Sequence, residues 1–213
     1  MITGEDLKAI FESSEFQAEL EDLSSYAANI RQERPIVYLL AKHFWRRGYK
    51  LALEKNRCDL VIDDTRIEFK FHFDSDMLSL QKELNRYGSD VERLMQAVSV
   101  KELSSTWTVS PGIYKDVIVK RPDIFVWILC ARDLGQLTSD DISRVCIGAQ
   151  QRRYNRDNPY GSNREFLTIA DDFLAKLQEL RKFSIEKTKI ITNSSFPSAY
   201  YLTTCDFVAV TTD

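Results

Sequence analysis

The fold is set by residues 58–73, which read CDLVIDDTRIEFKFHF. Two apolar runs flank the turn formers Asp63 and Asp64, so this stretch predicts two short β-strands joined by a tight turn. In the second strand, successive side chains point to opposite faces of the sheet. Four large apolar residues therefore share one face: Ile67, Phe69, Phe71 and Phe73. A slip of one residue would expose all four, which fixes the register of the strand.

The opposite face of the same strand carries Glu68, Lys70 and His72. The predicted hairpin brings Asp59 close to Glu68 and Lys70. Two carboxylates form a hard-oxygen site suited to Mg²⁺, which keeps most of its waters and needs few protein ligands. A lysine beside such an ion can orient a water molecule and offset negative charge on a phosphate. An ordinary surface pair of Glu and Lys on a hairpin is the alternative, and the tripeptide alone leaves both open.

Composition predicts one globular domain over residues 1–213, because 44% hydrophobic and 29% charged residues are typical of a chain with a real core. The net charge of −3 counts against a general polyanion binder, so any nucleic-acid contact would depend on a local basic patch. The four cysteines are far apart and only two histidines are present, which does not indicate a zinc site and favours a reduced, cytoplasmic protein. We expect no membrane partner, because there is no secretion signal and no apolar run of about 20 residues.

The rest of the chain predicts helices and a few strands. The predicted helices cover 4–30, 33–48, 77–100, 138–151 and 166–183. The predicted strands cover 49–54, 123–130 and 199–210, with a short extended piece at 114–119. The apolar run Ile124–Leu129 is typical of a strand buried on both faces. His43 falls on the apolar stripe of its helix, which predicts a packed, hydrogen-bonded histidine.

The densest basic and amide-rich segment is 150–156, which reads QQRRYNR. Arginine, glutamine and asparagine bond phosphates and base edges, and tyrosine can stack on a base. We therefore predict nucleic-acid contacts at Gln151, Arg152, Arg153, Tyr154 and Arg156. The alternative is a solvated helix end whose positive charge complements the helix dipole.

With this order of elements, residues 33–130 resemble the PD-(D/E)XK nuclease superfamily, which has the restriction-endonuclease-like fold. The matching residues are Glu33 on the first core helix, Asp59 opening the second strand, and Glu68-Phe69-Lys70 on the third. Asp90-x-x-Arg93-Leu94 on the following helix also looks like the pattern of some members. Cys58 stands where the family's name has proline, a position that varies within the superfamily.

The resemblance implies an α/β fold with an αβββαβ core, in which helices flank a mixed central sheet. The core would occupy residues 33–130. Residues 1–32 would form an N-terminal helical extension, and residues 131–213 would contribute C-terminal helices and a final strand.

The resemblance also implies a function, that of a metal-dependent endodeoxyribonuclease, such as one of a restriction or defence system. Asp59 and Glu68 would bind Mg²⁺, for which Mn²⁺ can substitute, and Glu33 would assist as a further metal ligand and catalytic residue. Lys70 would position or activate the attacking water. DNA would be the partner, and a homodimer would allow a double-strand cut. The alternative, motivated by the acidic balance, is a catalytically silent domain of this fold that binds nucleic acid or a protein partner.

Overall fold

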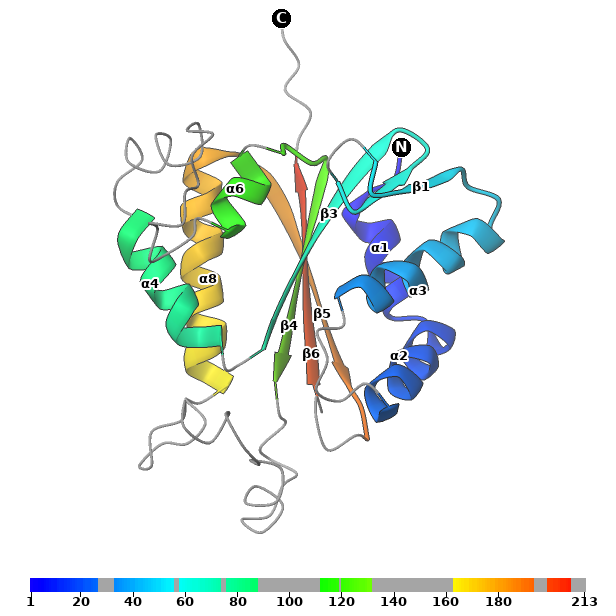
Figure 1. Ribbon diagram of the computed structural model, residues 1–213, viewed down its shortest axis with the longest axis horizontal. Helices are drawn as coiled ribbons and strands as arrows, with labels where there is room; N and C mark the ends of the chain where they lie inside the picture. Colours follow the sequence, from blue (N-terminus) through cyan, green and yellow to red (C-terminus); the bar gives the residue numbers. More distant parts are fainter. Residues whose placement is uncertain are drawn as a thin grey trace, which may run out of the picture.

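The computed structural model is an α/β structure in which a mixed six-stranded sheet lies between two layers of helices (Figure 1). It describes residues 1–26, 33–55, 58–73, 76–87, 112–118, 120–131, 163–193 and 199–207. The sheet has the order β1-β2-β3-β4-β6-β5. Its strands are β1 (Leu51–Leu53), β2 (Leu60–Ile62), β3 (Thr65–Phe73), β4 (Ile124–Ala131), β5 (Phe183–Ile191) and β6 (Ala199–Phe207). Only the β3–β4 pair is parallel among the described strand pairs.

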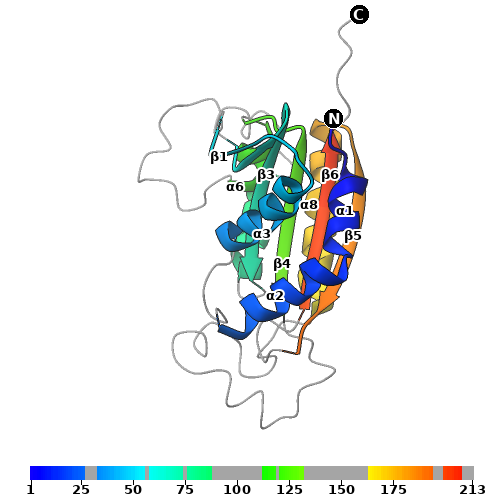
Figure 2. The same ribbon diagram turned by 90° about the vertical axis from the view of Figure 1, so that its right-hand side faces the viewer.

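Each face of the sheet has its own helical layer. One layer contains α1 (Gly4–Phe11), α2 (Ser14–Tyr26) and α3 (Glu33–Arg46). The other contains α4 (Met77–Tyr87), α6 (Gly112–Ile118) and α8 (Asn163–Leu180). Figure 2 shows the first layer in front of the sheet. Two buried apolar clusters follow from this arrangement, one on each side of the strands.

The register predicted for the central hairpin is confirmed. Ile67, Phe69, Phe71 and Phe73 are all buried in the core cluster formed with α1, α2 and α3. The two-residue turn before β3 places Asp63 at a φ of 52°, a left-handed conformation that aspartate tolerates better than most residues. Strand β4 is buried on both faces as expected, because its alternate residues belong to the two different clusters.

Three predictions of local structure are wrong. The single helix expected over residues 4–30 is broken, because α1 ends at Phe11 and the Ser13 hydroxyl accepts a hydrogen bond from the Phe16 N–H at 3.3 Å near the start of α2. The piece at 114–119 expected to be extended is instead the helix α6. The helix expected to reach residue 183 ends at Leu180. Phe183 begins β5, a strand that the sequence pattern did not predict.

Several other expectations fall partly or wholly outside the described residues. These are the second half of the predicted helix at 77–100, with Asp90 and Arg93, and the predicted helix at 138–151. Of the cysteines, Cys58, Cys130 and Cys205 are described, and all three are buried and form no disulfide. Within the described ranges, no helix combines the length and apolarity that crossing a bilayer requires.

Candidate functional site

The polar face of β3 lies toward α4, α6 and α8, and it carries Glu68 and Lys70 as predicted. Their partners in β4 are Phe125 and Trp127, which belong to the apolar cluster on that side of the sheet. His72 shares this face and accepts a hydrogen bond from the Trp127 indole N–H at 2.9 Å. The alternation along β3 therefore places charged groups over an apolar layer.

Asp59 comes close to this face through the register of the hairpin. Leu60 lies opposite Ile67, so Asp59 is next in line beside Glu68. Asp59 Oδ2 accepts a hydrogen bond from the backbone N–H of Phe69 at 2.8 Å. Burial raises the pKa of the Asp59 carboxyl, and the Phe69 N–H opposes that rise.

Glu33 reaches the same site from the first residue of α3. Burial raises the pKa of its carboxyl, the Lys70 ammonium lowers it and the Asp59 carboxylate raises it again. Electrostatic effects of this kind require the groups to be close together. The structure therefore gathers the four residues that the sequence predicts as catalytic: Glu33, Asp59, Glu68 and Lys70.

The free edge of β3 explains how these acids are held. Beyond the three residue pairs of the hairpin, β3 has no strand partner on the β2 side among the described residues. Acidic side chains instead face three outward backbone N–H groups, those of Phe69 (by Asp59), Phe71 (by Glu33) and Phe73 (by Asp76). Carboxylates thus take the place of a missing strand.

Glu68 is the most deeply buried acid of the site, at 2% exposed. Its Oε1 accepts a hydrogen bond from the Lys120 ammonium, while its Oε2 has no hydrogen-bond partner in the described part of the chain. Burial raises the pKa of the Glu68 carboxyl to about 7, although the Lys120 ammonium opposes this rise. A buried carboxylate oxygen without a partner is costly, so this position favours the approach of a cation.

The sequence pattern did not predict two residues of this site, Asp116 on α6 and Lys120 just after it. Asp116 Oδ2 lies 2.9 Å from Lys70 Nζ, and Asp116 Oδ1 lies 3.0 Å from Lys120 Nζ. The spacing of Asp116 and Lys120 is the signal that could have found them, because residues four apart meet on a helix. The segment was predicted as extended, and an extended chain separates such residues by about 13 Å.

The ion pairs also set the charge of the two lysines. Burial lowers the pKa of Lys70, but Asp116 and Glu33 outweigh it and the net pKa is raised. Burial likewise lowers the pKa of Lys120, and its contacts with Glu68 and Asp116 produce a net rise. Both ammonium groups therefore stay charged at neutral pH and bridge the acids of the site.

Glu83 on α4 extends the cluster. It is 7% exposed and accepts a hydrogen bond from the Ile113 N–H at 3.1 Å. Burial raises the pKa of Glu83 to about 7, while the Ile113 and Tyr114 N–H groups and Lys70 oppose the rise. The sheet cluster, as we call it, consists of Glu33, Asp59, Glu68, Lys70, Glu83, Asp116 and Lys120.

The sheet cluster is rich in acid, with five carboxyl groups and two ammonium groups. Burial is the main cause of the raised carboxyl pKa values, and the neighbouring acids add to it, so the site has an affinity for added positive charge. No protein-family model, curated protein or solved structure matches this chain.

The predicted nucleic-acid contacts cannot be placed in the same way. Gln151, Arg152, Arg153, Tyr154 and Arg156 all lie outside the described residues. The prediction that they contact DNA stays a prediction.

Proposed function

We propose that this chain is a Mg²⁺-dependent nuclease with a restriction-endonuclease-like fold, hydrolysing phosphodiester bonds of DNA. The order α3, β1, β2, β3, α4, α6, β4 supports the fold assignment, since it contains the αβββαβ core that the resemblance implies, with α6 added before the last strand. The parallel pairing of β3 with β4 agrees with a mixed central sheet.

The observation that carries the proposal is the convergence of Asp59, Glu68 and Lys70 at one end of the central hairpin. Oxygen ligands from two carboxylates are what Mg²⁺ prefers. The unpartnered Oε2 of buried Glu68 and the excess of acid in the sheet cluster are both features that a divalent cation would relieve. The donor set therefore fits this metal.

Asp59 and Glu68 would hold the ion, with Glu33 close enough to hold one of its waters. Bound there, Mg²⁺ would polarise the scissile phosphate and lower the pKa of a water molecule. The Lys70 ammonium would orient the attacking water and stabilise negative charge on the phosphate. Water adds at phosphorus, the bond from phosphorus to the 3′ oxygen breaks, and a 5′-phosphate and a 3′-hydroxyl result.

The direct test is cleavage of supercoiled plasmid by the purified chain with Mg²⁺. We expect Asp59→Ala and Lys70→Ala each to lower the rate by at least about 100-fold, since each removes a group that acts in the transition state. Asp64→Asn is the matched control, because Asp64 is an exposed carboxylate in the turn of the same hairpin. Equal cutting by wild type and Asp59→Ala would show that a contaminant is responsible.

A second candidate is a domain of this fold that binds DNA without cutting it. It is favoured by the internal pairing of Lys70 with Asp116 and of Glu68 with Lys120, which occupies groups that catalysis needs. Fluorescence anisotropy of labelled DNA, with and without EDTA, separates the two. Binding that needs no metal, with no cleavage of any of many substrates, would favour this candidate.

A further inference from the structure

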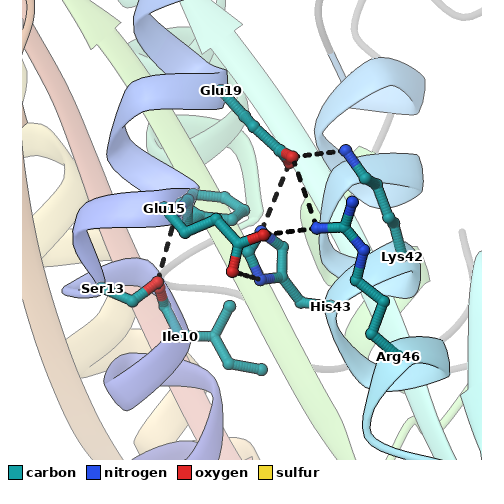
Figure 3. A network of polar contacts seen from close by, with 8 residues as sticks. Ile10, Ser13, Glu15, Glu19, Lys42, His43 and Arg46 are labelled. Atoms are coloured by element: carbon teal, nitrogen blue, oxygen red, sulfur yellow. Dashed lines mark hydrogen bonds and ion pairs between the residues drawn. The ribbon is translucent and has the colours of Figure 1, made fainter.

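A second group of acids lies between α2 and α3, on the other side of the sheet from Glu68 and Lys70 (Figure 3). Glu15 and Glu19 are one helical turn apart on α2, and His43 faces them from α3. One possible ligand atom from each of these three residues lies within 4.8 Å of the other two. With Lys42 and Arg46 they form what we call the helix cluster.

Each glutamate of the helix cluster divides its two oxygens in the same way. Oε1 of Glu15 bonds Arg46, while its Oε2 lies 3.8 Å from His43 Nδ1. Oε1 of Glu19 bonds Lys42, while its Oε2 lies 3.3 Å from His43 Nε2. Both acids thus present one oxygen to a cation at the surface and the other to the imidazole. In Figure 3, dashed lines join each acid to His43 and to the cations of α3.

The inner atoms of this arrangement are not satisfied by hydrogen bonds. His43 is 3% exposed and packs on Phe16, with ring centroids 5.6 Å apart. His43 Nε2 and Glu19 Oε2 are buried, and neither has a hydrogen-bond partner within the described ranges. Their separation is 3.3 Å. It matches the distance of about 3.3 Å between two ligands of one tetrahedral ion.

We propose that His43 Nε2, Glu19 and Glu15 bind a divalent transition-metal ion such as Zn²⁺, which joins α2 to α3. An ion at Nε2 beside Glu19 cannot also use Nδ1, so the exposed side chain of Glu15, which lies near Nδ1, would turn to reach it. An imidazole with two carboxylates suits zinc, whereas magnesium prefers oxygen ligands alone. Lys42 and Arg46 hold the outer carboxylate oxygens and orient the inner ones, as hydrogen-bond partners of metal ligands do. The histidine that the sequence predicts as a packed core residue thereby gains a second role.

The test is calorimetric titration of the full chain with Zn²⁺ alone. The parent protein carries Asp59→Asn, which weakens the sheet cluster as a competing metal site. We expect one equivalent of Zn²⁺ to bind the parent, and the affinity to fall at least about tenfold in Glu19→Gln and in His43→Gln. Asp22→Asn, an exposed acid on the same helix, is the matched control and should bind like the parent.

Two further measurements make the outcome decisive. Zn²⁺ should raise the midpoint of thermal unfolding of the parent but not of Glu19→Gln, because a ligand of the folded state stabilises it. The Co²⁺ complex should lack a thiolate absorption band, which excludes a cysteine site. The proposal is overturned if the parent binds no Zn²⁺, or if Glu19→Gln binds it as tightly as the parent. Should His43→Gln fail to fold, Glu19→Gln carries the test, since it keeps the size and shape of the side chain and replaces only one carboxylate oxygen by an NH2 group.

Discussion

The sheet cluster and the helix cluster both combine carboxylates with basic groups, but folding shifts a carboxyl pKa in opposite directions in the two places. It is raised at Glu68 and lowered at Glu19. Glu68 in the sheet cluster is 2% exposed, and burial raises the pKa of its carboxyl to about 7. Glu19 in the helix cluster is also subject to burial, which raises its pKa, but Lys42 and His43 outweigh that effect and the net pKa is lowered. The ionised form of a glutamate is thus disfavoured at Glu68 and favoured at Glu19.

The difference lies in the balance of charge. In the helix cluster, Arg46 pairs with Glu15 and Lys42 pairs with Glu19, and Arg46 also lies 3.8 Å from Glu19 Oε1. In the sheet cluster, five carboxyl groups share Lys70 and Lys120. Arg46 and Lys42 neutralise the outer oxygens of the helix cluster, so only its inner atoms at His43 are left without hydrogen bonds. The sheet cluster instead holds a buried excess of negative charge, which stores unfavourable energy that a ligand can release. Such an imbalance is typical of functional sites.

The largest effect is expected for Lys120→Met. Removal of this ammonium leaves Glu68 and Asp116 buried with less compensation, which should lower the free energy of unfolding by about 3 kcal/mol at pH 7.5. Lys42→Met removes a more exposed partner and should cost less than about 1 kcal/mol. Urea unfolding followed by circular dichroism measures both, with exposed Lys82→Met as control. Equal losses for Lys120→Met and Lys42→Met would remove the distinction between the clusters.

The pH dependence of stability is a second difference. The pKa values of Glu68 and Glu83 are raised from 4.5 to about 7, so the folded protein binds protons more tightly than the unfolded chain. The contribution of these two glutamates to the free energy of unfolding should therefore be greatest below about pH 4.5 and should fall as the pH rises toward 7.

Urea unfolding in EDTA at pH 5 and pH 7.5 measures this slope. Glu68→Gln and Glu83→Gln should each flatten it. Glu19→Gln should leave it unchanged, because the lowered pKa of Glu19 places its titration below 4.5. A slope that persists in both Glu68→Gln and Glu83→Gln would mean that other groups cause it.

The smallest effect concerns salt. The ion pairs of Arg46 and Lys42 are partly exposed, with side chains 46% and 41% accessible. Salt screens such pairs, so in 0.5 M NaCl the difference in stability between wild type and Arg46→Met should become much smaller. The loss in Lys120→Met should persist at the same salt concentration, because Glu68 is buried. Thermal unfolding at low and high salt compares the two variants, and equal salt sensitivity would contradict the contrast.

The sequence predicted the parts of the site that depend on local pattern. The alternation along β3 determined which residues share a face with Glu68, and the short hairpin placed Asp59 beside it. Glu33 could be added only through the resemblance, since its approach to Lys70 depends on how α3 packs on the sheet. The predictions for β3 and the hairpin succeeded because strands have a strict period of two residues.

The remaining residues depend on tertiary packing or on an ambiguous pattern. Helix α6 has only seven residues and is rich in apolar side chains, and a short apolar segment does not distinguish helix from strand. That ambiguity concealed Asp116 and Lys120. Phe183 extends the apolar spacing of α8 although it begins β5, so the strand was read as the end of the helix. Glu83 reaches the site only because α4 packs against α8 and the start of α6.

The acids along the free edge of β3 also bear on how copies of this chain behave toward one another. An unpaired strand edge is a template for a strand from a neighbouring molecule. The N–H groups of Phe69 and Phe73 already donate to Asp59 and Asp76, and the negative charges would repel an identical edge. Alanine at these two positions should therefore promote aggregation as well as remove carboxylates. Asp59, proposed as a metal ligand, would then also protect the protein, together with Asp76, against polymerisation through its own sheet.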